Sequence, residues 1–303
     1  MDNLTHSLVG ALIGQAGLKR RTGLAMPALI VGANLPDVDA ACFLWLDGVE
    51  HLSFRRGITH GPPAWVLLPL VLAGLLYGFD RWQAIRGTRP AARLPVRFGW
   101  LYALSFLACL THPALDWLNV YGIRLLEPFS SRWSYGDILF IIDVWLWALM
   151  GFATWFSLRR EKRGGEWKRP ARVALSVALA YVGLNAGITK IDELSGPRIS
   201  GFVTIESPVP LVAWQRETLT QKNDGQWWIE RSLVGECSLD PIRQARAGNS
   251  QVEAFLFWSR APFAERARDG SVLLRDARFY DPRARDRFTV ALPDVQCEPL
   301  VAQ

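Results

Sequence analysis

The stretch Asn34–His60, NLPDVDAACFLWLDGVEHLSFRRGITH, places acids, arginines and a histidine inside an otherwise apolar part of the chain. Pro36 lacks an N–H and pushes the residue before it toward extended geometry, so a regular helix cannot run through it. Asp37 and Asp39 are therefore expected to project from an interrupted backbone. Carboxylate and imidazole groups are the donors that a divalent metal ion prefers. Taken alone, the motif also fits a surface loop with an Asx turn.

The apolar residues are concentrated before about residue 190 of the 303, and the chain as a whole is 50% hydrophobic. Apolar runs of about 18 residues or more are typical of membrane spans. We therefore predict a polytopic α-helical membrane domain over residues 1–190, with about six segments, followed by a small β-rich domain over residues 191–303. The candidate segments are Leu4–Leu18 and Leu24–Leu46, which carry polar interruptions, and Gly61–Phe79, Phe98–Val120, Ile138–Leu158 and Val173–Ile188.

The net charge of +6 resides mainly in short basic segments beside the predicted spans. This distribution indicates membrane topology rather than a nucleic-acid-binding surface. The first residues are acidic and polar, so no cleavable signal peptide is expected. Placing the basic segments on the cytoplasmic side of the membrane puts the N-terminus and everything after about Asp192 on the external side. The segments are Lys19–Arg21, Arg81–Arg97 with five arginines, and Arg159–Arg172 with seven Lys or Arg against two Glu.

The last third of the sequence is more polar, and its short runs of β-branched and aromatic residues predict strands. Turn signals such as Asn223-Asp-Gly and Asp269-Gly separate these runs. Cys42 and Cys109 lie in apolar segments and are expected to be inert, whereas Cys237 and Cys297 could pair in an oxidising compartment. The predicted strands lie at Phe202–Ile205, Trp227–Glu230, Val252–Trp258, Ser271–Leu274 and Arg287–Leu292.

The four histidines all lie in the predicted membrane domain, and His112 and Asp116 share one helix face at the i, i+4 spacing. Counting about 1.5 Å per residue from Phe98, His112 is about 21 Å along its span. A similar count for the other acids and histidines gives the same depth. Ionisable residues inside a membrane usually pair, bind ions or line a path. We therefore predict a shared metal site at the external interface. The positions that converge on this depth are His6, Asp37, Asp39, His60, His112, Asp116 and Asp143.

Four motifs in order resemble the YdjM/YbcI-type family of bacterial inner-membrane proteins, which are regarded as metal-dependent hydrolases, some of them named for LexA regulation. The motifs are Asp2–Gly10, Leu35–Asp39, Arg56–His60 and Thr111–Asp116, and the resemblance covers about residues 1–160. Members often carry His-Arg-Gly-x-Thr-His-Ser, where this chain has Arg55 at the first position and Gly61 at the last. This departure leaves a ligand role at the first position open, and His51 is an alternative donor.

The prediction that follows is a membrane-bound metal-dependent hydrolase of an ester or phosphoester, lipid-linked substrates included, at the outer face of the bacterial inner membrane. With this resemblance, the external side becomes the periplasm, where residues 191–303 are expected. One or two divalent ions would be held by His6, His60, His112, Asp116 and one or both of Asp37 and Asp39. Zinc suits these ligands, and manganese remains open. Asp137 or Asp143 would act as general base or orient a histidine, and Arg56 would contact a phosphate.

Two functions from other classes remain as alternatives. A transporter or ion-conducting protein would use its intramembrane acids to line a path, and charged residues would then be spread through the membrane depth. A scaffold would carry a metal that is only structural, while its external domain binds a partner. The chain contains neither HExxH nor Gly-x-Ser-x-Gly, so neither of these hydrolase signatures applies.

Overall fold

The computed structural model describes residues 1–195, 202–222, 225–284 and 287–300. The chain forms two compact units: unit 1 comprises Met1–Asp39 and Arg56–Ala186, and unit 2 comprises Ala40–Arg55 and Gly187–Gln303. Unit 2 therefore takes in an internal segment, Ala40–Arg55, that a division of the sequence at residue 190 would assign to the membrane domain.

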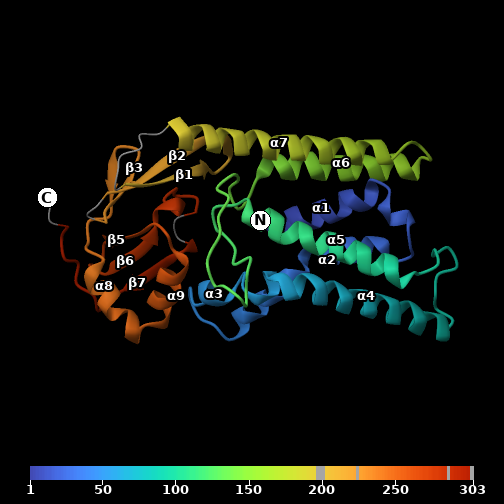
Figure 1. Ribbon diagram of the computed structural model, residues 1–303, viewed down its shortest axis with the longest axis horizontal. Coiled ribbons are helices and arrows are strands. Elements are labelled where there is room, and N and C mark those ends of the chain that lie inside the picture. Colours follow the sequence, from blue (N-terminus) through green and yellow to red (C-terminus); the bar gives the residue numbers. More distant parts are fainter. Residues whose placement is uncertain (196–201, 223–224, 285–286, 301–303) are drawn as a thin grey trace. The chain divides into compact units, whose positions relative to one another are not determined.

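Unit 1 is a bundle of helices that run between the same two ends (Figure 1). At one end the amino group of Met1 lies against Asp116, and at the other Lys19 pairs with Glu161. Successive long helices alternate in direction between these ends. The helices are α1 (Asn3–Gln15), α2 (Ala25–Asn34), α4 (Pro62–Ile85), α5 (Phe98–Trp117), α6 (Val144–Lys162) and α7 (Lys168–Ser195), with the 3-10 segments η1 (Leu18–Arg20), η2 (Leu35–Leu44) and η3 (Ile58–His60). The last residues of η2 and of α7 belong to unit 2.

Helix α1 lies in the interior of the bundle, where it contacts α2, α5 and α6. Asp2 caps its first turn by accepting hydrogen bonds from the amides of Leu4 and Thr5. Gly10 allows close packing against α2, because a Cβ at this position would lie 2.5 Å from the carbonyl oxygen of Leu29. Three polar residues of α1, Thr5, His6 and Gln15, are therefore buried in the core.

Four helical segments are long and apolar enough to cross a membrane, so the expectation of about six is wrong in number for the residues that the structure describes. Helix α1 has 13 residues and is about 20 Å long, short of the roughly 30 Å hydrocarbon core. Helix α6 ends in Arg159, Arg160 and Lys162, so its apolar part is also short. The four segments are Ala25–Leu44, Pro62–Ile85, Phe98–Trp117 and Lys168–Ser195.

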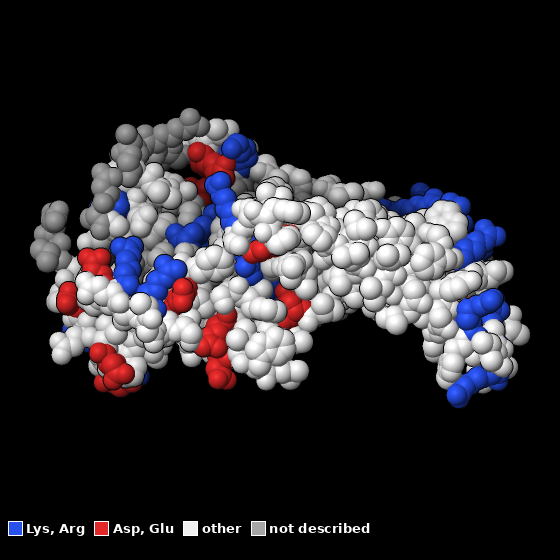
Figure 2. Space-filling model, turned by 60° about the horizontal axis from the view of Figure 1, so that its bottom comes forward, with Lys and Arg blue, Asp and Glu red and all other residues white. Residues whose placement is uncertain are grey.

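The three basic segments of the sequence meet at one end of unit 1, which we call the basic end. The amide of Gly23 donates to the carbonyl of Pro95, and Lys19 pairs with Glu161, so the segments Lys19–Arg21, Arg81–Arg97 and Arg159–Arg172 are neighbours. Figure 2 shows the blue side chains of this end beside a flank on which only uncharged residues are visible. The opposite end, which we call the histidine end, carries His60 and His112.

Unit 2 contains two antiparallel sheets. The first has the order β1 (Val203–Val209), β2 (Val212–Gln221), β3 (Trp227–Ile229), β4 (Ser232–Val234), and the second has the order β5 (Pro262–Arg266), β6 (Val272–Asp276), β7 (Thr289–Leu292). Trp227, Trp258, Phe255 and Phe279 are fully buried within this unit. The predicted strands near 202, 227, 271 and 287 are therefore confirmed. The predicted turn at Asn223-Asp-Gly lies partly outside the described residues.

The segment Val252–Trp258, predicted as a strand, is instead part of helix α9 (Ser250–Trp258). The side chain of Asn249 caps this helix by accepting hydrogen bonds from the amides of Gln251 and Val252. Three apolar residues at a spacing of three are buried on one face of this helix: Val252, Phe255 and Trp258. A helix therefore buries these side chains as a strand would. Helix α9 packs against α3 (His51–Phe54), and α8 (Asp240–Ala245) precedes it.

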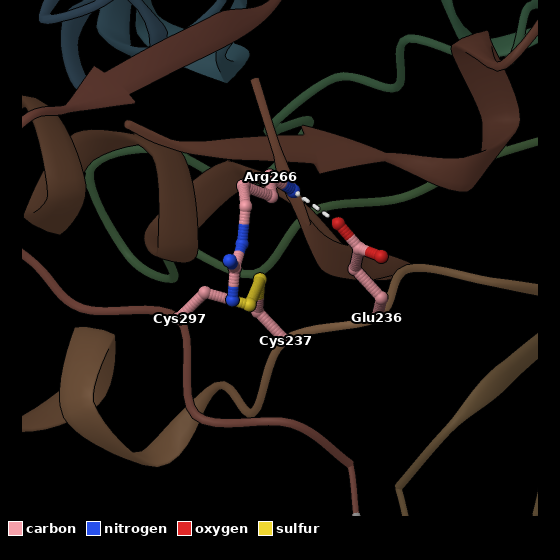
Figure 3. Close-up of a disulfide and its surroundings, with 4 residues drawn as sticks. All are labelled: Glu236, Cys237, Arg266 and Cys297. Atoms are coloured by element: carbon pink, nitrogen blue, oxygen red, sulfur yellow. Dashed lines mark hydrogen bonds between the residues drawn. A yellow bond between two sulfur atoms is a disulfide. The ribbon is translucent and has the colours of Figure 1, made fainter. Parts of the chain in front are cut away.

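Cys237 and Cys297 form a disulfide (Figure 3), which confirms the predicted pairing, whereas Cys42 and Cys109 are buried thiols. The bridge joins the segment before α8 to the C-terminal segment across 60 residues of chain. Beside it, the amide of Arg266 donates to the Glu236 carboxylate over 3.1 Å. In the chain-entropy model, closing a loop of this length stabilises the folded unit by about 4 kcal/mol.

Candidate metal centre

Side chains from four separate segments meet at the histidine end of unit 1. The interruption at Pro36 ends α2 at Asn34 and continues the chain as the 3-10 turn η2, which carries Asp37 and Asp39. The other members are His6 on α1, His60 on η3, and His112 and Asp116 on α5. The three histidines and Asp116 have no exposed surface, Asp39 is buried and Asp37 is partly exposed.

His60, His112 and Asp116 present three donor atoms at the spacing of ligands to one ion. The Nε2 atoms of His60 and His112 lie 3.2 Å apart, and Asp116 Oδ2 lies 3.5 Å from the first and 3.4 Å from the second. Ligands placed tetrahedrally at about 2.0–2.1 Å from a zinc ion are about 3.3–3.4 Å apart. An ion at the centre of this trio would therefore have normal bond lengths without rearrangement of the side chains.

The hydrogen bonds behind each imidazole decide which nitrogen faces the centre of the trio. His112 Nδ1 lies 2.7 Å from the carbonyl oxygen of Ala33, which can only accept, so Nδ1 carries the proton and Nε2 presents a lone pair. Thr59 Oγ1 donates to Asp39 Oδ2 over 3.1 Å and accepts from His60 Nδ1 over 3.0 Å. This assignment leaves both Nε2 lone pairs facing each other, an arrangement that a shared cation relieves.

Two further residues of the cluster surround the trio. Asp37 Oδ1 lies 3.9 Å from His60 Nε2 and 3.8 Å from His112 Nε2. The His6 ring stacks on that of His112 with a centroid separation of 3.8 Å, and its Nε2 lies 3.4 Å from Asp116 Oδ1. His6, Asp37 and His112 form a second group of donor atoms within 4.8 Å of one another.

Several buried polar atoms of the cluster have no hydrogen-bond partner among the described residues. They are both ring nitrogens of His6 and Oδ2 of Asp116. Leaving a buried polar atom unsatisfied costs about 1–3 kcal/mol, and such atoms in a native protein call for an explanation. A divalent cation would satisfy Asp116 Oδ2 and the one ring nitrogen of a neutral His6 that carries a lone pair, so the residues present fit a metal ion.

Asp39 lies behind His60 rather than beside the trio. Its Oδ2 accepts hydrogen bonds from Thr59 Oγ1 and from the Arg56 amide over 2.8 Å, and it faces the Nδ1 side of His60 at 3.5 Å. Burial lowers the pKa of His60, with Asp116 and Asp39 opposing that effect, so the imidazole is held in the neutral form that binds metals. The position suits an orienting carboxylate better than a direct ligand.

Arg56 is buried and directs its guanidinium at the other oxygen of Asp116, Oδ1, over 3.0 Å. Its Nη1 donates to Asn119 Oδ1 over 3.3 Å and to the carbonyl of Gly122 over 2.9 Å, and the guanidinium lies over the Tyr121 ring at 4.3 Å. The backbone at Arg56 has a positive φ of 54°. Arg56 thereby fixes Asp116 so that Oδ2 faces the histidines.

The two acids predicted as catalytic occupy other positions. Asp143 is the N-cap of α6: its Oδ1 accepts from the amides of Trp145 and Leu146, and its Oδ2 accepts from Tyr181 over 2.8 Å. Asp137 has a positive φ of 53° and precedes Ile138, whose amide bonds to the Leu118 carbonyl at the end of α5. Neither Asp137 nor Asp143 takes part in the described contacts among the residues of the cluster.

His51, the alternative donor, lies in unit 2, where its Nδ1 contacts the Gly48 carbonyl at 3.0 Å and its ring packs on Phe43. Sequence reasoning missed Asn119, Thr59 and the Ala33 carbonyl, which hold the ligands in place. Thr59 carried a signal, because three of the four histidines follow a threonine. Asn119 and a main-chain carbonyl carry no such signal, because only the fold brings them to the site.

The family model for the YdjM inner membrane protein matches residues 1–190, which include every member of the cluster. The chain belongs to the YdjM family. A protein of Bacillus subtilis strain 168 named "Uncharacterized protein YfhP" is 28% identical over 167 residues. This match covers 52% of the chain and 47% of that protein, so the chain spans about half the length of its curated relative. No solved structure matches the chain.

Proposed function

We propose that this YdjM family member is a membrane-bound, metal-dependent hydrolase of an ester or phosphoester. The observation that carries the proposal is the pair of Nε2 atoms 3.2 Å apart on His60 and His112, with Asp116 Oδ2 3.4–3.5 Å from both. Four apolar helices and the inner-membrane family support the membrane location. Imidazole and carboxylate ligands suit zinc, and manganese is the second choice.

A bound divalent ion would lower the pKa of a ligated water and polarise the scissile group. The residues of the chain supply orientation: Ala33 and Thr59 fix the two imidazoles, and Arg56 fixes Asp116. Asp37 Oδ1, at 3.8–3.9 Å from the two Nε2 atoms, is too distant for the tight trio but close enough to accept a proton from a water held there. We assign Asp37 the role of general base in place of Asp137 and Asp143.

An amphiphilic, lipid-linked substrate fits the residues adjacent in sequence to the cluster. Val38, Ile58 and Trp117 are 50%, 58% and 39% exposed, and each is one or two positions from Asp37, His60 or Asp116. Exposed apolar side chains at the end of membrane helices accommodate an acyl or prenyl chain next to a reacting headgroup. A substrate of this kind would reach the cluster from the lipid bilayer.

We further propose that the histidine end and the C-terminal residues face the periplasm. The positive-inside rule assigns the basic end to the cytoplasm, and the histidine end lies at the opposite end of unit 1. The Cys237–Cys297 disulfide supports this assignment independently, because such bonds persist in oxidising compartments such as the bacterial periplasm.

A structural metal in a scaffold protein is the second candidate, and complete burial favours it. The side chains of His60, His112 and Asp116 have no exposed surface, as in closed structural sites. In that case no substrate would reach the ion.

The experiment that separates these functions uses the purified full chain in detergent, assayed with soluble and micellar carboxylester and phosphoester probes. The proposal predicts hydrolysis that a chelator abolishes, that zinc or manganese restores, and that is absent from His112→Ala but normal in Cys109→Ala. Cys109 is a matched control because it is buried on the same helix and none of the described contacts within the cluster involves it. Loss of thermal stability on chelation, with no hydrolysis of any probe, would instead support the structural ion.

A further inference from the structure

A group of cations surrounds one buried tryptophan at the basic end of unit 1. Trp167, which is 6% exposed, precedes α7, and its ring lies 4.3 Å from Lys19 Nζ and 5.6 Å from Lys168 Nζ. The guanidinium of Arg20 lies 5.2 Å from the same ring. These cations come from η1 and from the start of α7, so the fold brings together two basic segments about 150 residues apart in sequence.

Arg172 joins this group one turn further along α7. Its Nε donates to the Ala16 carbonyl over 2.9 Å, at the turn where Gly17 has a positive φ of 130°. A Cβ on Gly17 would lie 3.6 Å from Arg172 Nη2 and 3.6 Å from the Lys168 side chain, so both side chains border the same turn. We call Lys19, Arg20, Lys168 and Arg172 the tryptophan cation cluster.

The described acids near this cluster do not balance its charge. Glu161 pairs with Lys19, and Glu166 uses its Oε1 to accept hydrogen bonds from the amides of Lys168 and Arg169. Those two amides, followed by the charges of Lys168 and Arg172, lower the pKa of Glu166. Four cations against two carboxylates leave an excess of two positive charges. Arg20 and Arg172 are exposed, so an outside anion can reach them.

In the second basic group at this end, two arginines share one carboxylate of the same unit. Asp80 on α4 pairs with Arg89 over 3.0 Å and with Arg93 over 2.9 Å. Arg93 also donates to Gln83 over 2.6 Å, and Arg89 donates to the Leu94 carbonyl over 2.9 Å. These arginines tie the loop after α4 to its helix and share a carboxylate, whereas none of the described ion pairs involves Arg20 or Arg172.

We propose that the tryptophan cation cluster binds the phosphate of an anionic phospholipid headgroup. Lys168 begins a helix long and apolar enough to span a membrane, so the cluster lies at headgroup level, where tryptophan is enriched. Basic residues at this level attract anionic lipids, and a guanidinium binds phosphate through two parallel hydrogen bonds. The site lies at the end of unit 1 opposite the histidines and is independent of the proposed hydrolase activity.

The test is native mass spectrometry of the full chain in detergent with phosphatidylglycerol, compared with phosphatidylethanolamine. Lys168→Gln/Arg172→Gln should weaken phosphatidylglycerol binding at least about tenfold. The matched control, Arg81→Gln/Arg86→Gln, removes two charges from α4 and its C-terminus at the same end and should leave binding unchanged. Lys168→Arg/Arg172→Lys keeps the charge and should retain binding, which separates loss of the site from misfolding.

Three results would overturn the proposal. Equal losses in both double glutamine variants would show a diffuse electrostatic surface, and no loss in either would show that lipid binds elsewhere. Full displacement of phosphatidylglycerol by millimolar inorganic phosphate would show a site for soluble anions instead of a lipid site.

Discussion

His60 is oriented by a short series of polar contacts that leads away from the cluster. Its Nδ1 contacts Thr59 Oγ1, which donates to Asp39, and Asp39 also accepts from the amide of Arg56. The PDxD motif thus uses its two acids differently: Asp37 faces the Nε2 side of the histidines, and Asp39 faces the Nδ1 side of His60. A neutral imidazole with its proton fixed on Nδ1 is a better metal ligand than a freely rotating one.

Asp39→Asn should weaken metal binding without abolishing it, because the variant removes the charge behind His60 but leaves the trio of donor atoms intact. We expect a loss of about 10–100-fold in affinity, measured by competition with a chromogenic chelator. Asp47→Asn, at an exposed acid of unit 2, is the control and should bind as the parent does. Complete loss of metal from Asp39→Asn would show that Asp39 is a direct ligand, and unchanged affinity would show that it does not orient His60.

At the scale of elements, the site depends on close approach of α1 to α2 and of α2 to α5. Gly10 faces the carbonyl of Leu29, and a Cβ on Gly32 would lie 3.1 Å from the carbonyl of Ser105. These contacts carry His6 and His112 to the same end of the bundle and bring the Ala33 carbonyl to His112 Nδ1. Small residues at helix interfaces are typical of membrane bundles.

Gly10→Ala should destabilise unit 1 by about 1–3 kcal/mol, because the added methyl group meets the main chain of α2, which cannot move aside as a side chain can. Gly74→Ala is the matched control: Gly74 is inside α4 with open space around it, and alanine favours a helix by about 0.5–1 kcal/mol over glycine. Thermal unfolding in detergent should show a lower midpoint for the first variant and an equal or higher one for the second. Equal midpoints for both would contradict the close packing of α1 on α2.

Local sequence patterns predict some elements and site residues correctly, but they do not predict contacts between residues far apart in the sequence. The i, i+4 spacing of His112 and Asp116 predicted a shared face because both residues lie on one helix. The roles of Asp39, Asp143 and Arg56 depend on partners far away in sequence, such as Thr59, Tyr181 and Asp116, which no local pattern names. The α9 segment was predicted as a strand because its aromatic content outweighed its period of three and its Asn249 cap.

At the scale of the whole chain, charge and cysteine pairing both bear on orientation across the membrane. The basic segments gather at one end of unit 1, and unit 2 contains a disulfide. Both features agree with a cytoplasmic basic end and a periplasmic C-terminus. Four helical segments, rather than about six, are long and apolar enough to cross a membrane. Helices α1 and α6 alternate in direction with these four, so the chain enters and leaves unit 1 at the histidine end.

Alkaline phosphatase fused after Gln303 should be active in cells, because that enzyme needs the oxidising periplasm to form its own disulfides. A cytoplasmic fluorescent reporter at the same position should be dark. Fusions at Gly87, in the basic loop after α4, provide the control and should give the opposite pattern. An active cytoplasmic reporter after Gln303 would contradict the periplasmic location of unit 2.

The central claim, that His60, His112 and Asp116 hold a divalent ion, is tested most directly by measuring metal per chain in purified Asp116→Asn. This substitution keeps the shape of the side chain but removes the charge that attracts a cation to Oδ2. Elemental analysis by mass spectrometry should find zinc or manganese bound to the parent protein and to Cys109→Ala, and a loss of at least about tenfold in Asp116→Asn at equal expression. Full metal content in Asp116→Asn would contradict the claim and would leave Asp116 as the structural partner of Arg56.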